Sequence, residues 1–156
     1  MANGCKVDFS DLQKFRENLE KSLSGDQLEL FIESCAKELA ARLLAKVIKR
    51  TPVGQYPAGS GKKGGTLRRG WTGEKSQPAS TYVGSLKVTR AGGAYTIEIV
   101  NPVEYASYVE YGHRTRNHKG WVEGKFMLTI SEEEIRKSAP NILEKKLEKY
   151  LKECFQ

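Results

Sequence analysis

Residues that could do chemistry gather between positions 51 and 71, where glycines are interspersed with cations and no acid is present. Gly54 and Gly59 have the separation found in a phosphate-binding loop. Ser60 and Gly61 then stand where that motif needs a Lys followed by Ser or Thr, so the cation and the magnesium-binding hydroxyl are missing. The segment also leaves a helical pattern, whereas a phosphate-binding loop joins a strand to a helix. The sequence therefore argues against a nucleotide site.

The histidines, cysteines and carboxylates give no stronger candidate. His113 and His118 have cationic neighbours, namely Arg114, Arg116 and Lys119. These cations would repel a metal ion, and no Cys or Asp lies between the two histidines. The three cysteines are scattered without metal-ligand spacing or a nearby base, and the acidic run at 132–134 suits a helix start. We therefore expect no enzymatic activity, no metal and no cofactor.

Two basic segments are better suited to binding. Residues 51–71 and 112–124 are expected to form mobile loops, because Gly, Pro and charged residues bury little apolar surface. Cations without opposing acids favour an anionic surface, or a partner that orders the loop on contact. The predicted partner-binding residues are Lys62, Lys63, Arg68, Arg69, Trp71, Tyr108, Glu110, Arg114, Arg116 and Trp121.

Length and composition indicate the class of protein to which these segments belong. The chain has 156 residues, which predicts a single domain over residues 1–156 with enough length for a core. Its net charge of +7 favours nucleic acid or acidic protein surfaces without choosing between them. No apolar run approaches the ~18–20 residues of a membrane span. The N-terminus shows no secretion signal, and the odd number of cysteines fits a reducing compartment.

Helical periodicity is the strongest structural signal. Apolar residues recur at helical spacing over residues 26–50, and Thr51-Pro52 should end that helix because the residue before a proline resists helical geometry. Alanines on this helix indicate core packing. Further helices are predicted after Ser10, at 103–111 between Asn101-Pro102 and Gly112, and from residue 138 onward.

Strand signals lie mainly in the middle of the chain. Residues 82–90 and 94–100 are predicted to form an antiparallel hairpin that turns at 91–93 and packs its apolar face on the long helix. A short strand is predicted at 6–9, and residues 125–135 fit either a strand or a helix start. These elements predict an α+β fold: a long amphipathic helix on a small antiparallel sheet, with N- and C-terminal helices and long basic loops.

The order of the motifs resembles a known family. The long helix ends in TPV at 51–53, and three later motifs read GTLRRGW at 65–71, VEYASYVEYG at 103–112 and GKFM at 124–127. From residue 28 to the last helix, this order resembles the tail-completion family of tailed bacteriophages and prophages, whose members are small neck proteins. The link at 54–64 is longer than the family's usual short one and is similar to the version in defective and contractile-tailed prophages.

The resemblance implies a non-enzymatic virion protein that is made in the host cytoplasm and acts in head–tail joining and tail completion. It also implies a ring of identical copies that meets the head connector or adaptor and the tail tube or terminator, with non-specific contact to traversing DNA and no membrane. The residues alone leave an alternative, a basic nucleic-acid-binding accessory protein. In that hypothesis the cations follow phosphates and the tryptophans stack on bases.

Overall fold

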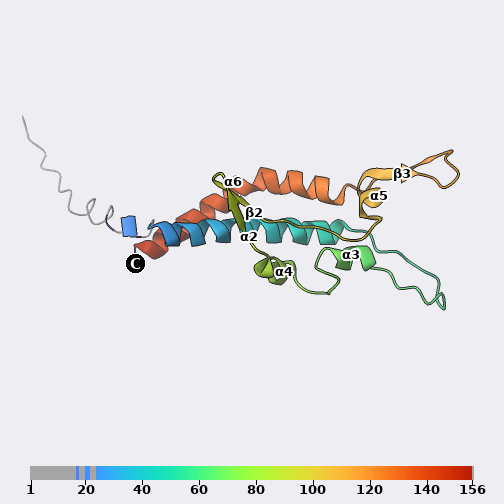
Figure 1. The fold of residues 1–156 in the computed structure, drawn as a ribbon, viewed down its shortest axis with the longest axis horizontal. Coiled ribbons are helices and arrows are strands. Elements are labelled where there is room, and N and C mark those ends of the chain that lie inside the picture. The colour runs from blue at the N-terminus through green and yellow to red at the C-terminus, as the bar shows by residue number, and fades with distance from the viewer. Residues whose placement is uncertain (1–16, 18–19, 22–23, 156) are drawn as a thin grey trace, which may run out of the picture.

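The computed structural model describes residues 17, 20–21 and 24–155. The strand predicted at 6–9 and the apolar positions of the first predicted helix lie outside these residues. The described elements are α2 (Gly25–Arg50), α3 (Thr66–Gly70), α4 (Ala79–Ser85), β1 (Thr89–Ala91), β2 (Ala94–Thr96), α5 (Ala106–Tyr111), β3 (Gly112–Arg114), β4 (Trp121–Glu123) and α6 (Met127–Cys154). Long helices with small antiparallel hairpins confirm the predicted α+β class (Figure 1).

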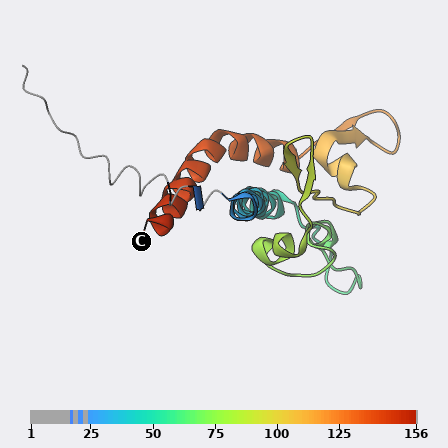
Figure 2. The same cartoon turned by 60° about the vertical axis from the view of Figure 1, so that its left-hand side comes forward.

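The long helix α2 confirms the strongest expectation, since it starts one residue before the predicted position and ends at Arg50. Thr51 follows in an extended conformation, and its Oγ1 donates a 2.7 Å hydrogen bond to the carbonyl of Val47. Pro52 comes next and prevents another helical turn. Helix α2 has its most extensive contacts with α4 and α6, and Figure 2 shows α6 curving past it.

Helix α6 differs from the sequence expectation. It runs unbroken from Met127 to Cys154, with Pro140 in its interior, so the predicted start near residue 138 is wrong. A proline inside a helix removes one hydrogen bond and bends the axis, and Figures 1 and 2 show the bend. Contacts on both sides of Pro140 hold the helix against α2: Lys46 pairs with Glu134 at 2.7 Å, and Lys146 pairs with Glu38 at 2.8 Å.

The strand predicted at 82–90 is also wrong over most of its length. Residues 79–85 form helix α4, which starts after Pro78 and buries Val83 in the core. Only Thr89–Ala91 is a strand, and it pairs with Ala94–Thr96. The predicted turn is confirmed, since Gly92 and Gly93 have φ angles of 57° and 79°. The second strand ends early, and Ile97 and Ile99 beyond it pack against the core.

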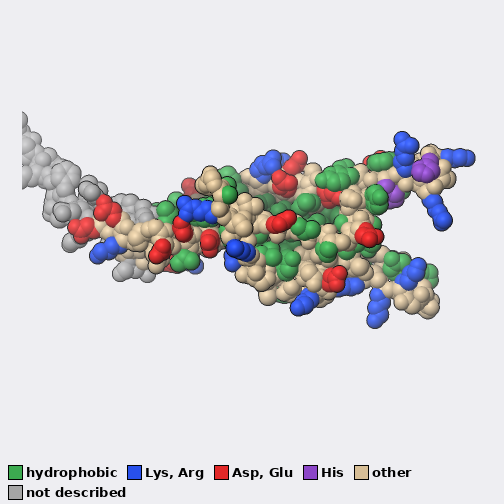
Figure 3. Space-filling view, viewed as in Figure 1, with side chains coloured by type: hydrophobic (Ala, Val, Ile, Leu, Met, Phe, Trp, Pro, Cys, Tyr) green, Lys and Arg blue, Asp and Glu red, His purple; other side chains and the backbone are tan. Residues whose placement is uncertain are grey.

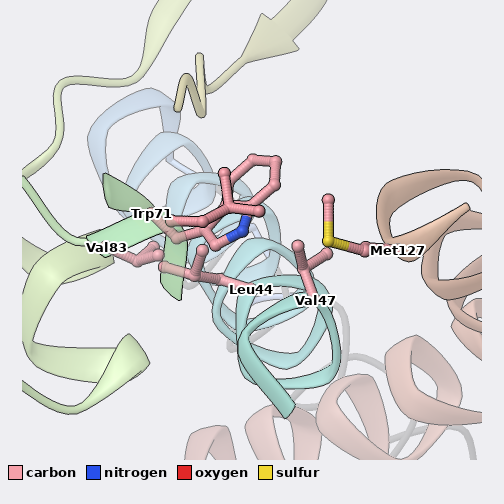
Figure 4. Packing of buried hydrophobic residues seen from close by; sticks show 6 residues of the cluster. Leu44, Val47, Trp71, Val83 and Met127 are labelled. Carbon is pink, nitrogen blue, oxygen red and sulfur yellow. The ribbon is translucent and has the colours of Figure 1, made fainter. Parts of the chain in front are cut away.

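The core lies where α2 meets α3, α4 and the start of α6. It is formed by Leu44, Val47, Leu67, Trp71, Val83 and Met127. Figure 4 shows the two α2 side chains between Trp71 and Val83 on one side and Met127 on the other. These apolar contacts supply most of the stabilisation that fixes the short helices on the long one.

Helix α5 is shorter than predicted and is not capped by Asn101. Its first residue is Ala106, and Gly112 ends it with a φ of 87°, as expected. The amide of Asn101 instead joins two segments. Its Nδ2 donates to the carbonyl of Leu67 at 2.8 Å, and its Oδ1 accepts from the backbone of Val103 at 3.2 Å.

Candidate interaction surface

Two basic segments extend from the same end of the helical body (Figures 1 and 3). We call residues 52–65 the first arm and residues 112–124 the second arm. The first arm leaves the C-terminal end of α2, and the second arm lies between α5 and α6. Their cations Lys62, Lys63, Arg114, Arg116 and Lys119 are all exposed. The structure thus places at one end of the body cations that lie about fifty positions apart in the sequence.

The first arm is closed at its base by Thr51. The guanidinium of Arg68 donates to the carbonyl of Thr51, at 2.7 Å from Nη2 and 3.2 Å from Nε. The indole Nε1 of Trp71 donates to Oγ1 of the same residue at 2.8 Å. Trp71 is only 5% exposed. These bonds correct the expected loop over 51–71: its last part, 66–71, is folded into the body, and Trp71 is a core residue.

Glycine lets the two limbs of the first arm approach each other. A Cβ atom at Gly64 would lie 1.9 Å from the carbonyl oxygen of Gly54, so no other residue fits there without a rearrangement. The Arg69 guanidinium donates to the Gly64 carbonyl at 3.4 Å and is half-buried. Further out, the Lys62 ammonium lies 5.9 Å from the centre of the Tyr56 ring, a cation–π distance.

The second arm is a β-hairpin, not the loop that was expected. His113 pairs with Val122, and Arg114 pairs with Trp121. At the tip, Thr115 donates its backbone N–H to the Gly120 carbonyl at 3.0 Å. Within the described residues, Nδ1 of His113 is buried without a hydrogen-bond partner, and its ring lies 5.8 Å from that of Tyr108.

The base of the second arm is locked to α5. The backbone N–H groups of Lys125 and Phe126 donate to the carbonyls of Val109 and Glu110, at 2.7 and 3.0 Å. These carbonyls are at the end of α5, where the helix itself supplies no donors. A Cβ atom at Gly124 would lie 2.3 Å from the Glu110 carbonyl oxygen, so this closure also needs glycine.

Glu110 was predicted to bind a partner, but it is only 6% exposed. Its carboxylate accepts hydrogen bonds at 2.9 Å from the backbone N–H groups of Leu128 and Thr129, and one at 2.7 Å from the Thr129 hydroxyl. These donors belong to the first turn of α6, where a negative charge is favoured by the helix dipole. Glu110 therefore caps a helix inside the subunit and presents no surface to a partner.

Aromatic side chains accompany the exposed cations. Tyr105, Tyr108 and Tyr111 are 45%, 59% and 62% exposed, and Trp121 is 55% exposed. Tyr108 and Tyr111 are three residues apart, which places them on the same side of α5, and Tyr105 immediately precedes this helix. From the sequence, Tyr108 and Trp121 were predicted to bind a partner, whereas Tyr105 and Tyr111 were not. Tyr56, 50% exposed on the first arm, was also missed.

A pocket of about 270 Å³ opens between the first arm and α5. We call it the arm pocket. Its lining includes the apolar groups of Val53, Tyr56, Leu67, Tyr105 and Val109, together with Lys63. The volume suits one large side chain, and the cation at the rim favours an acidic neighbour of that side chain.

Ionic contacts in the body lie along the helices. Hydrogen bonds from Lys146 and then from Arg42 lower the pKa of Glu38, and bonds from Lys46 and then from Arg50 lower the pKa of Glu134. Burial raises the pKa of the Cys35 thiol, which disfavours the nucleophilic thiolate. The pairs of Lys146 with Glu38 and of Lys46 and Arg50 with Glu134 join α6 to α2.

The described part of the chain holds no group of three or more His, Cys, Asp or Glu residues placed to bind a metal ion. Among its helices, none has both the length and the apolar character of a membrane-spanning segment. What it does present is an exposed set of cations and aromatic rings at one end. Arginine, tyrosine and tryptophan are the residues most enriched where proteins bind proteins.

Comparison with curated proteins and with solved structures gives no match. Comparison with protein families matches residues 13–112 to the family described as "Bacteriophage HK97-gp10, putative tail-component". The matched residues include α2, the first arm and α5, and they end where the second arm begins. Since the match spans well over half of the chain, the protein belongs to this family of bacteriophage tail components, as its motif order indicated.

Proposed function

We propose that this tail component acts at the neck of the virion, where it joins head and tail as a ring of identical copies. The observation that carries the proposal is the position of the two arms, which offer exposed cations and aromatic rings at the same end of a helical body (Figure 3). A structural joint needs such surfaces and needs no catalytic groups. We further propose that the protein is not an enzyme and that it is made in the host cytoplasm.

In this proposal the arms contact adjoining virion proteins: neighbouring copies, the head connector or adaptor, and the tail tube or terminator. The contacting residues are Lys62, Lys63, Tyr108, Arg114, Arg116 and Trp121. Arg68 and Arg69 contribute indirectly by holding the base of the first arm. Long segments that order on contact are expected at the heterologous interfaces of a ring.

Charge reversal on the arms tests the proposal. Particles that lack the native protein would be complemented with Lys62→Glu plus Lys63→Glu, or with Arg114→Glu plus Arg116→Glu. Electron microscopy would then count joined and separate heads and tails. We expect separate heads and tails, because both pairs are exposed on the arms that we propose to contact the partners.

The matched control is Lys87→Glu plus Lys137→Glu, which makes the same charge change at exposed positions away from the arms. This control should give joined particles. Arg68 is avoided, because its loss would open the bond to Thr51 and confuse a folding defect with a binding defect. Normal particles from both arm variants would remove the arms from the mechanism.

A second candidate function is that of a basic accessory protein that binds nucleic acid, or of a ring through which DNA passes. The exposed cations beside Trp121, itself 55% exposed, favour it, since bases stack on such rings. Binding of this kind weakens steeply with salt. If the protein binds DNA in this way, a gel-shift experiment on the isolated subunit should show DNA retention that falls as the salt concentration rises. The absence of any shift at physiological salt would dismiss this candidate.

A further inference from the structure

We propose that the arm pocket of one copy receives Leu30 of a second copy, so that the subunits join head to tail. This inference rests on the proposed ring and adds the identity of the two surfaces that meet. One surface is the arm pocket with Lys62 and Lys63 beside it. The other is an acidic face on the first turns of α2.

The acidic face is formed by Asp26, Leu30 and Glu33. Leu30 is 61% exposed, although α2 packs elsewhere against α4 and α6. Asp26 and Glu33 lie four residues before and three residues after it, and both are exposed or half-buried on the same side of α2. Along α2, Leu30 is thus an apolar anchor with a carboxylate before and after it. On the α6 side, Lys146 and Lys149 line the groove next to Leu30, and they pair with Glu38 and Glu153.

Charge supports this pairing. Residues 24–34 contain acids and no Lys or Arg, whereas residues 51–73 contain cations and no acid. Glu29 is already paired with Arg90, which leaves Asp26 and Glu33 as the carboxylates that flank Leu30. Several acidic side chains lie over the end of the molecule opposite the arms (Figure 3). An acidic anchor therefore matches a pocket whose rim carries Lys63.

The two surfaces cannot meet within one subunit. Leu30 lies near the start of α2 and Thr51 follows its end, so the helix separates them by roughly 30 Å at 1.5 Å per residue. The contact must then be made between copies. Because the pocket and the anchor are different surfaces, each copy would bind one neighbour through its pocket and the other neighbour through its anchor. Such a head-to-tail contact produces a closed ring if the rotation between successive copies returns to the first copy.

A charge-swap mixture tests the pairing, with assembly measured by sedimentation velocity. One chain carries Lys62→Glu plus Lys63→Glu, and the other carries Asp26→Lys plus Glu33→Lys. Each alone should stay monomeric, because like charges then meet. The mixture should assemble, since each altered surface finds a partner of opposite charge. The Lys87→Glu plus Lys137→Glu control should assemble as the native chain does.

Leu30→Ala tests the anchor separately and should weaken assembly about 10- to 100-fold, the value of burying one leucine side chain. A photoreactive residue at position 30 should crosslink to Val53, Tyr56 or Tyr105 of another copy. Circular dichroism and urea unfolding show that each variant is folded.

The outcomes separate this inference from the proposed function. Native rings with no recovery in the mixture, or crosslinks from position 30 that fall outside the arm pocket, would overturn the pairing and leave head–tail joining intact. A native chain that stays monomeric at its highest soluble concentration would also overturn it. Arm variants that still join heads to tails would instead refute the proposed function.

Discussion

The indole of Trp71 donates a 2.8 Å hydrogen bond to the hydroxyl of Thr51, inside the core and across twenty positions of sequence. The same hydroxyl donates onward to the Val47 carbonyl at 2.7 Å, so the end of α2, the end of α3 and the base of the first arm share one polar junction. A buried polar group without a partner is costly, and this junction satisfies all of its members.

Thr51→Val should therefore destabilise the fold by about 1–3 kcal/mol, because it leaves the Trp71 N–H buried and unpaired. Thr51→Ser keeps the hydroxyl and should cost less. In urea unfolding, Thr51→Val combined with Trp71→Phe should cost less than the sum of the single changes, since both remove the same bond. Strict additivity would show that the bond contributes nothing.

Glu110→Ala should cost about 3 kcal/mol, since it leaves two backbone N–H groups at the start of α6 without an acceptor. Glu110→Gln keeps one acceptor oxygen and should cost about 1–2 kcal/mol. Thermal unfolding provides the measurement. Glu104→Ala is the control, because that residue is exposed and should change the stability by less than about 0.5 kcal/mol. Equal effects of Glu104→Ala and Glu110→Ala would rule out the capping role.

Glu134 should make the stability of the fold depend on pH in the acidic range. Hydrogen bonds from Lys46, and then from Arg50, lower its pKa from the usual 4.5, so its contribution is fully present above that pH and is lost as the pH falls through the lowered pKa. Glu134→Gln should be less stable than the native chain at neutral pH, and the difference should shrink below about pH 4.5.

The measurement is urea unfolding over a series of pH values. Glu133→Gln is the control, since its exposed side chain forms no ion pair within the described residues, and it should change neutral-pH stability less. A Glu134→Gln difference that stays constant down to the lowest pH would show that the pairs with α2 do not stabilise the fold.

Gly64→Ala should disturb the first arm and spare the body, because its Cβ would meet the Gly54 carbonyl at 1.9 Å while the core lies elsewhere. Limited proteolysis should cut faster within 52–65, and the unfolding midpoint should change little. Gly84→Ala is the matched control. Nothing lies within 4 Å of its added Cβ, so it should stabilise α4 by about 0.5–1 kcal/mol. An unchanged cleavage pattern in Gly64→Ala would argue against the close approach.

Some of the fold could be predicted because its signals are local. The helix 26–50 has its apolar stripe and its proline stop within the segment, and the Gly92-Gly93 turn needs only the backbone freedom of glycine. The resemblance to tail components likewise rests on short motifs in order, and the family match confirms it.

The remainder depends on contacts distant in sequence. The 82–90 segment alternates like a strand, but burial of Val83 and a 3.0 Å bond from Lys37 to the Gly84 carbonyl hold its first part as helix against α2. Helix α6 continues through Pro140, and its contacts with α2 on both sides of the proline, which include two ion pairs, join segments that are distant in sequence. In the candidate site, the burial of Trp71 and Glu110 depends on Thr51 and on the start of α6, which no local pattern reveals.

The bond between Arg68 and the Thr51 carbonyl affects how the sequence of this subunit can change in evolution. It holds the two ends of the first arm together, so the fold of the helical body does not depend on the length or sequence of the segment between those ends. Doubling the length of such a closed segment costs only ~0.6 kcal/mol. Insertions or substitutions within 52–65 can therefore adapt the same subunit to a different partner surface, while every residue of the core keeps its position.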